Sequence, residues 1–407
     1  MKSRQRALCL VIALAFVCLV SSQPIAYSDY LTEWSGSVPV LGITVHNYPH
    51  PVAALSCVTS EATIFCVGGL NGTSQTTRST FSAPLSKLGI GNWTKLSDYP
   101  TGIAGQACAT YSGYVYCVGG LQTAGSTTSN PQISSAVYFA PLAASGVGEW
   151  ARAADYPFGV YDQSCATSGR YIYCVGGIAS NSSSVSAVEY AQLSPSGIAG
   201  WKVAGSYPLK VSAESCSAYA SRLYCVGGLN ATSIAIDSVF SASLNGSEPG
   251  WTDEEAYPTP VAGQSCIVHY PGLYCVGGLN ATSLATRSVF FSYINDTYLN
   301  WIGSVSYPVD IQSQSCVSYS SQIYCVGGYD GTQILGSAYF SSVGPVQAGH
   351  GTTSVTATGA TSSPGAVFPY PLAYDLVLAG TASASIIIIA RPAPKKRNTV
   401  EGPSQEG

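Results

Sequence analysis

The sequence has little charge and few of the side chains that usually carry catalysis or bind metal. Only 9% of its 407 residues are charged, the formal net charge is −4, and there are 4 histidines. Because lysine and arginine are sparse, the chain offers no basic field to attract a nucleic-acid backbone. We therefore expect no nucleic-acid partner.

Motifs for cofactors and nucleophiles are missing as well. We find no Gly-x-Ser-x-Gly elbow with a partnered histidine. The Gly-Gly pairs end strand-like segments and precede Leu, Ile or Tyr, whereas a phosphate loop needs a following helix and Lys-Ser/Thr. The sequence thus predicts no catalytic residue, no cofactor and no metal.

Cysteine, in contrast, is abundant and regularly spaced. Of 14 cysteines, two fall in the first 22 residues and the other twelve form six pairs, each flanking eight residues and followed by Val-Gly-Gly. The pairs are Cys57/Cys66, Cys108/Cys117, Cys165/Cys174, Cys216/Cys225, Cys266/Cys275 and Cys316/Cys325. Their period of about 50 residues indicates a closed repeat architecture.

Strand geometry predicts how the cysteines pair. Tyr, Val, Ile and Leu crowd both halves of the ten-residue segment, and a turn such as Ser112-Gly113 lies at its centre. Cys108 and Cys117 then become a non-hydrogen-bonded cross-strand pair, whose side chains come close enough for a disulfide. We expect six such disulfides, each contributing about 2.5 kcal/mol. Zinc is the rival interpretation, but its ligand sets use tighter spacings.

The first residues predict export. Residues 1–22 resemble a secretory signal, with a basic start, an apolar middle and the small-residue cleavage site Val20-Ser21-Ser22. An uncleaved signal anchor is the alternative. An even number of cysteines in an exported chain favours disulfides over free thiols or metal.

Each repeat contains four strand-like segments and ends at a tryptophan. The last repeat ends near Phe340 without one, while Trp34 stands ahead of the first cysteine pair. A strand around Trp34 would complete the last sheet and leave no open edge.

A hydrophobic strand ending in Gly-Gly, an aromatic strand and a Trp, repeated about every 50 residues, resemble the kelch repeat over residues 34–345. The resemblance implies an all-β, six-bladed kelch-like β-propeller closed by the N-terminal strand. Kelch propellers include adhesion and scaffolding modules as well as enzymes such as galactose oxidase and sialic-acid mutarotases, so the resemblance selects no single function. The paired cysteines depart from the usual pattern and suggest a version adapted to an oxidising exterior.

The C-terminal part predicts a membrane anchor. Residues 346–367 form a Ser/Thr/Gly/Pro-rich stalk, residues 368–390 an apolar segment, and residues 391–407 a basic tail that we place in the cytoplasm. A helix of this length spans about 34 Å, enough for a bilayer. A processed signal and a short buried strand are the alternatives.

Three Asn-x-Thr sequons share one repeat position just after Gly-Gly-Leu, at Asn71, Asn230 and Asn280. They are candidate glycosylation sites in exposed loops. The alternative is that Asn serves the turn, as Asp330 would in the last repeat.

A second repeat position supplies the candidate ligand site. Two residues before the first cysteine of each pair the chain has, in order, Leu55, Gln106, Gln163, Glu214, Gln264 and Gln314. The four glutamines and Glu214 could form a polar mouth for a sugar or peptide, extended by Asp162, Lys210 and Asp310 in the same loops. Alternatively, each side chain satisfies backbone groups between neighbouring blades.

Together these features predict a cell-surface, membrane-anchored propeller that binds an extracellular glycan or protein without catalysis. The alternatives are a carbohydrate-active enzyme and a structural component of the cell envelope. Clustered acids with a converging Arg or His would favour the enzyme, and a fully packed channel the envelope component.

Overall fold

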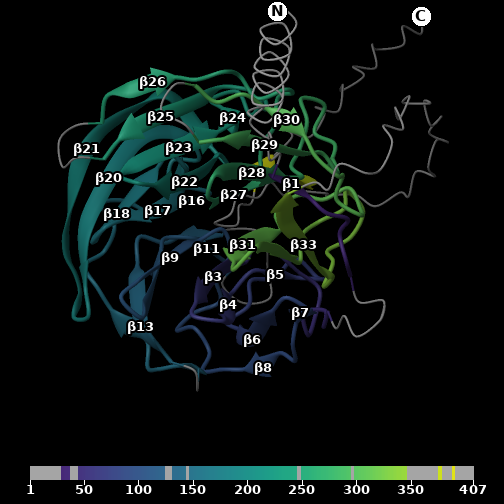
Figure 1. Cartoon of the computed structure of the whole chain (residues 1–407). Coiled ribbons are helices and arrows are strands. Elements are labelled where there is room, and N and C mark those ends of the chain that lie inside the picture. The colour runs from purple at the N-terminus through teal and green to yellow at the C-terminus, as the bar shows by residue number, and fades with distance from the viewer. Residues whose placement is uncertain are drawn as a thin grey trace, which may run out of the picture.

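The computed structural model describes residues 29–36, 45–123, 131–143, 146–244, 249–294, 298–345, 375–377 and 387–389. The expected signal peptide, stalk and cytoplasmic tail lie outside these residues. The described chain is a ring of six antiparallel sheets, the blades, arranged around a central axis (Figure 1). The prediction of a six-bladed β-propeller is therefore confirmed.

Every blade repeats one strand order, and its first strand lies nearest the axis. The inner strands are β3 (Ser56–Ser60), β9 (Ala107–Tyr111), β17 (Ser164–Ser168), β22 (Ser215–Tyr219), β27 (Ser265–His269) and β31 (Ser315–Tyr319). The second strands are β4 (Thr63–Val67), β10 (Tyr114–Val118), β18 (Tyr171–Val175), β23 (Arg222–Val226), β28 (Gly272–Val276) and β32 (Gln322–Val326). The third strands are β6 (Thr80–Ser86), β13 (Val137–Ala143), β20 (Val185–Ser194), β25 (Val239–Ser243), β29 (Val289–Tyr293) and β33 (Ala338–Pro345).

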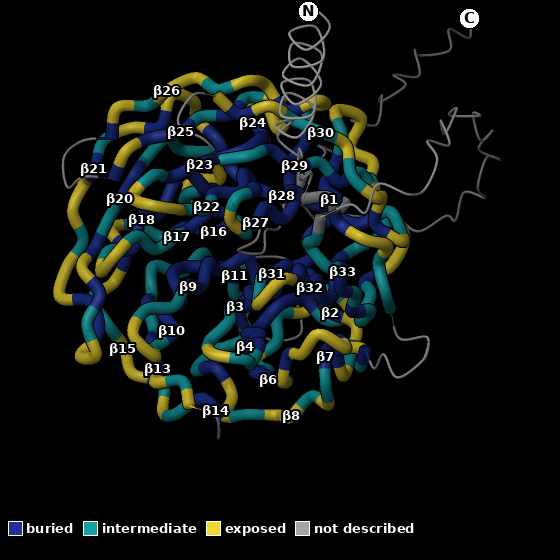
Figure 2. The backbone as a smooth tube through the Cα atoms, in the orientation of Figure 1, coloured by how far each residue is buried: buried dark blue, intermediate teal, exposed yellow. Residues whose placement is uncertain are grey.

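The outer strands are short, apart from one long strand in blade 3, and those of blades 1 to 5 are more exposed than the strands inside them (Figure 2). They are β8 (Thr94–Lys95), β15 (Ala151–Arg152), β21 (Gly197–Ser212), β26 (Trp251–Asp253), β30 (Ile302–Gly303) and, in blade 6, β1 (Asp29–Leu31). Two-residue strands extend the loops: β2 (Val52–Ala53) with β5 (Leu70–Asn71), β11 (Leu121–Gln122) with β12 (Gln132–Ile133), β16 (Val160–Tyr161) with β19 (Ile178–Ala179), β24 (Leu229–Asn230) with β21, β7 (Gly89–Ile90) with β6, and β14 (Gly146–Val147) with β13.

The N-terminal strand closes the ring, as the sequence predicts. β1 pairs antiparallel with β33, with Leu31 opposite Val343, and Ser35 forms a further bridge to Phe340. The indole of Trp34 lies edge-on to the ring of Tyr307, with 4.9 Å between the ring centroids. In the other five blades a tryptophan of the same repeat takes this place at 4.8–4.9 Å from the Tyr of Tyr-Pro. Trp34 is therefore the missing sixth tryptophan.

The six predicted disulfides are all present, each within its own blade. Cysteines nine residues apart face one another across the first two strands, with Cα atoms 4.0–4.1 Å apart. The bonds join Cys57 to Cys66, Cys108 to Cys117, Cys165 to Cys174, Cys216 to Cys225, Cys266 to Cys275, and Cys316 to Cys325. In every blade the strand register places the two partners directly opposite one another. All twelve cysteines are buried.

The Val-Gly-Gly motif is explained by a close approach between blades. The first glycine, for example Gly68 in blade 1, has a φ of +65°, and a Cβ there would lie 2.6 Å from the carbonyl oxygen of Ile103 in blade 2. The second glycine, Gly69, donates its N–H to that same carbonyl at 2.8 Å. A side chain at the first position would separate the blades.

The proposed transmembrane segment is described only in part. Within residues 368–390, β34 (Asp375–Val377) pairs antiparallel with β35 (Ile387–Ile389), and the rest of the segment lies outside the described residues. Among the residues that the structure describes, no helix has the length and apolar character to cross a membrane. Membrane anchoring therefore stays a prediction.

Replacing Trp34 with alanine tests closure by the N-terminal strand. We expect Trp34→Ala to lower the free energy of unfolding by about 3 kcal/mol, because it removes the indole that covers Tyr307. Trp301→Ala, which uncovers Tyr257 within a single blade, should cost a similar amount, and Leu88→Ala at an exposed position should cost almost nothing. Chemical unfolding measures all three. A harmless Trp34→Ala beside a costly Trp301→Ala would show that the ring closes without this strand.

Candidate functional site

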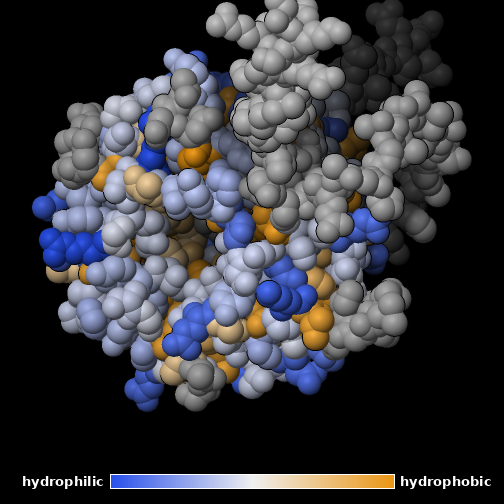
Figure 3. Space-filling view, in the orientation of Figure 1, coloured by the Kyte–Doolittle hydropathy of each residue, from blue (hydrophilic) through white to orange (hydrophobic). Residues whose placement is uncertain are grey.

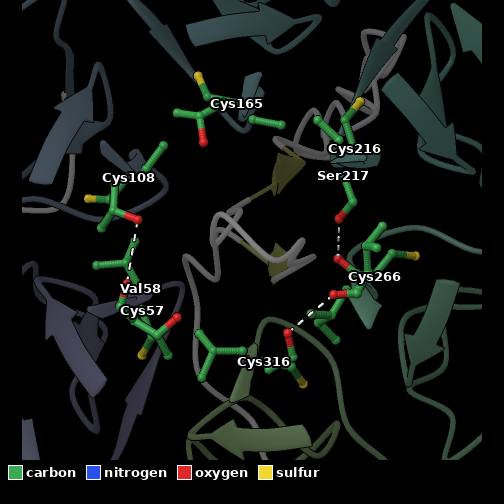
Figure 4. A pocket seen from close by; sticks show the side chains of 18 residues that line it. Cys57, Val58, Cys108, Cys165, Cys216, Ser217, Cys266 and Cys316 are labelled. Carbon is green, nitrogen blue, oxygen red and sulfur yellow. Dashed lines mark hydrogen bonds between the residues drawn. The ribbon is translucent and has the colours of Figure 1, made fainter. Parts of the chain in front are cut away.

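The inner strands surround a central cavity of about 250 Å³ (Figure 4). Each contributes three consecutive residues: Cys57–Thr59, Cys108–Thr110, Cys165–Thr167, Cys216–Ala218, Cys266–Val268 and Cys316–Ser318. None of these lining residues carries a formal charge, and their cysteines are all held in disulfides. The wall therefore offers hydroxyl groups, backbone groups and small apolar side chains.

The second cysteine of each disulfide stands one layer behind this wall. These six residues lie on the second strands, have 0% exposure and are not among the lining residues. They are Cys66, Cys117, Cys174, Cys225, Cys275 and Cys325. Each disulfide therefore ties the cavity wall to the next strand of its own blade, and its role is structural.

Hydrogen bonds run from blade to blade around this wall. The Ser217 hydroxyl donates to the carbonyl of Cys266 at 2.8 Å, and that of Ser318 donates to Val268 at 3.2 Å (Figure 4). At the start of the inner strands, Ser56, Ser164, Ser215, Ser265 and Ser315 each accept the N–H of the next blade's first cysteine at 2.9–3.0 Å. Blade 2 has Ala107 at this position and lacks the bond.

One end of the cavity is bounded by a closed ring of backbone hydrogen bonds, which we call the collar. Its six members lie two residues before the inner strands, and each donates its N–H to the carbonyl of the member in the preceding blade at 2.9–3.2 Å. They are Ala54, Gly105, Asp162, Ala213, Gly263 and Ser313, all with φ between 57° and 66°. All six are buried, so the collar is the less exposed end of the described ring.

The opposite end is more open. Along every inner strand the residues are buried near the collar and partly exposed near the turn that leads to the second strand. We call this end, formed by the six turns between first and second strands, the hairpin mouth. Tyr111, Tyr219, Tyr270 and Tyr319 lie on its rim. Among the described residues, this is the more exposed end of the cavity.

The predicted glutamine ring lies inside the walls instead of at a mouth. Gln106, Gln163, Glu214, Gln264 and Gln314 all have 0% exposure. The Nε2 of each glutamine donates to a valine carbonyl at the end of the preceding blade's second strand, at 2.7–2.8 Å. This geometry supports the alternative in which the ring joins blades. The ligand-binding role has no exposed atom to act through and stays an untested prediction.

Glu214 is the one ionisable member of that ring. Its Oε1 lies 2.8 Å from the point that a Cβ on Gly176 would occupy, whereas in four other blades a glutamine Nε2 lies 2.9–3.2 Å from the corresponding point. Burial raises the pKa of Glu214 to about 8, although the N–H groups of Glu214 and Ser164 oppose this in part. A neutral carboxyl can donate a hydrogen bond as the amide does, and a carboxylate cannot.

The other residues singled out by the sequence are dispersed. Asp162 belongs to the collar, Lys210 is exposed on β21, and Asp310 forms an exposed ion pair with Arg287 at 2.9 Å. They do not form one site. Among the described residues no group of three or more His, Cys, Asp or Glu side chains could hold a metal ion.

The three candidate glycosylation sites take the geometry expected of turn residues. The Oδ1 of Asn71 accepts the N–H groups of Thr73 and Gln75, each at 3.0 Å, and Asn230 and Asn280 repeat this pattern. The carboxylate of Asp330 has a similar role, since its Oδ1 accepts the N–H groups of Thr332 and Gln333. Because the Nδ2 takes no part in these bonds, the turn role and a glycan are compatible, and glycosylation stays a prediction.

The comparisons with known proteins support the fold and nothing finer. No protein-family model and no curated protein matches the chain. Among solved structures, one described as "Structure of YjhT" is similar, with a TM-score of 0.60 and 14% identity over 72% of this chain and 95% of that one. In all, 818 solved chains match. A fold shared so widely does not select a function.

The placement of Glu214 predicts a pH-dependent stability. With a pKa near 8 in the folded state, this carboxyl keeps a proton that the unfolded chain releases above about pH 4.5. The free energy of unfolding should therefore fall as the pH rises from about 4.5 to 8. Glu214→Gln should remove this fall and stabilise the protein at pH 8.5 by on the order of 3 kcal/mol, with little effect at pH 4.5.

Chemical unfolding across that pH range measures the effect. Gln264→Glu is the matched control, because it places an acid at the equivalent position of blade 5 and should introduce the same fall there. A Glu214→Gln variant whose stability tracks that of the wild type at every pH would refute a neutral Glu214.

Proposed function

We propose that the protein is an exported, kelch-like propeller that binds an extracellular glycan or protein ligand at its hairpin mouth without catalysis. The observation that carries this proposal is the asymmetry of the cavity, which is bounded by the collar at one end and more exposed at the other. Its hydroxyl and carbonyl wall suits a neutral, hydrogen-bonding ligand.

The lining argues against the enzyme alternative. Catalysis needs a positioned acid, base or nucleophile, or a metal. The lining residues include no Asp, Glu, His, Lys or Arg, and disulfide bonds remove the nucleophilic thiols. The hydroxyl groups that remain have no general base beside them in the described lining.

The proposed location follows from covalent chemistry and sequence. Six disulfides in one domain indicate folding in an oxidising compartment. The signal-like start and the apolar segment at residues 368–390 support export followed by anchoring, with the propeller outside the cell. The sequons agree with an exterior location.

Partial filling of the cavity tests the binding site. The full-length chain in detergent should capture at least one glycan or protein from a printed array, and Ala218→Phe should weaken that capture at least tenfold by placing a ring in the cavity wall. Ala231→Phe, in an exposed loop, is the control and should change nothing. Unaltered capture by Ala218→Phe, with an unchanged melting temperature, would exclude the cavity. A captured glycan that emerges chemically changed would favour the enzyme.

Truncation tests the anchor separately. A chain ending at Gly365 should be secreted into the medium, whereas the full chain should stay with membranes through a carbonate wash, because only the full chain contains the apolar segment. Release of both would assign residues 368–390 to a processed signal or to the fold.

A further inference from the structure

Two tyrosines from neighbouring blades lie stacked on the rim of the hairpin mouth. Tyr219 ends β22 in blade 4, and Tyr270 occupies the turn between β27 and β28 in blade 5. Their ring centroids are 4.9 Å apart and their planes are 16° from parallel. Tyr219 is 36% exposed and Tyr270 61% exposed, so the stack presents an aromatic face to solvent.

This stack is a departure from the repeat. The turn position of Tyr270 is occupied in the other blades by Glu61, Ser112, Gly169, Ala220 and Ser320, none of which is aromatic. The aromatic residues that every blade shares, such as the Tyr of Tyr-Pro, are buried and pack the walls. The repeated tyrosines therefore serve packing, whereas Tyr270 is exposed and has no aromatic counterpart at its turn position in the other blades.

Exposed aromatic surface has a cost in water, which an occupant would remove. A tyrosine ring offers a flat apolar face with a negative π cloud and a hydroxyl at its edge. The ring of a neutral sugar offers the complement: one face of weakly positive C–H groups, surrounded by hydroxyls that need hydrogen-bond partners. The Ser217 hydroxyl and its Cys266 carbonyl partner line the cavity on β22, which ends at Tyr219, and on β27, which Tyr270 follows.

We propose that Tyr219 and Tyr270 form a platform on which one ring of a neutral oligosaccharide stacks, with neighbouring sugar units reaching the polar wall of the cavity. The proposal rests on the proposed function and names the ligand class of the same mouth. The uncharged lining favours a neutral saccharide over an anionic or cationic ligand, because it holds no formal charge to compensate the ligand's own.

Calorimetric titration of the full-length chain in detergent tests the platform. The probes are neutral hexasaccharides of glucose, mannose, galactose and N-acetylglucosamine. At least one should bind, and Tyr270→Ala should weaken its affinity at least tenfold, while Tyr270→Phe keeps the ring and stays within about threefold of the wild type. Tyr298→Ala, at another exposed tyrosine (65%), should have no effect.

Tyr219→Ala should also weaken binding. Because Tyr219 lies in blade 4, this second variant shows that the loss does not come only from a changed turn in blade 5. Melting temperatures check that each variant is folded. The proposal is overturned if no hexasaccharide binds, or if one binds equally well to Tyr270→Ala. If an array ligand is captured through the cavity while Tyr270→Ala leaves its affinity unchanged, the proposed function stands and the platform does not. Capture of an apolar peptide in place of sugar by the tyrosine pair would likewise overturn the saccharide assignment.

Discussion

Backbone hydrogen bonds between blades are the constraint on which the rest of the molecule depends. An inner strand can pair with a second strand on only one edge, so its other edge and the loop before it need partners elsewhere. The collar supplies them for the loops, since each N–H from Ala54 round to Ser313 meets the carbonyl of the blade before it. The collar residues are all in a left-handed conformation, and the separate Val-Gly-Gly motif supplies glycine where two blades approach closely.

The repeat made much of the fold predictable. Two cysteines on an antiparallel hairpin face one another only if each lies the same number of residues from the turn. Their spacing in the sequence therefore predicted the disulfides. Trp34 was recognisable as part of the last blade because the other five repeats each end in a tryptophan, whereas Trp34 precedes the first repeat. The collar was not predictable, because Ala, Gly, Asp and Ser share no pattern in sequence except small size. The repeated glutamine position was evident in the sequence, but whether its side chain faces a mouth or a neighbouring blade was not. That depends on where the valine carbonyls of the preceding blade lie, which only the folded structure shows.

Departures from the repeat carry information that the repeat itself cannot. Glu189 lies opposite Cys174, where the other blades have Phe81, Tyr138, Phe240, Phe290 and Tyr339. Those aromatic rings pack against the Tyr of Tyr-Pro, and in blade 3 Phe158 packs against Tyr156 instead, with 5.1 Å between ring centroids. Burial raises the pKa of Glu189 in blade 3, as it does that of Glu214, which precedes the inner strand of blade 4 and lies against Gly176 of blade 3.

Tyr270 is a departure of another kind, because it adds exposed surface where Glu189 and Glu214 alter buried contacts. On the face shown in Figure 3, hydrophobic residues are scattered among hydrophilic ones, as on most globular proteins. An isolated exposed tyrosine would therefore mean little. The stacked pair is more informative because it combines an exposed aromatic surface with a position at the more exposed end of the cavity. The collar lies at the buried end, and the inner strands become exposed toward the other. Because so many proteins share this fold, local departures from the repeat are where a particular function would differ, and the exposed pair of Tyr219 and Tyr270 is one such departure in blades 4 and 5.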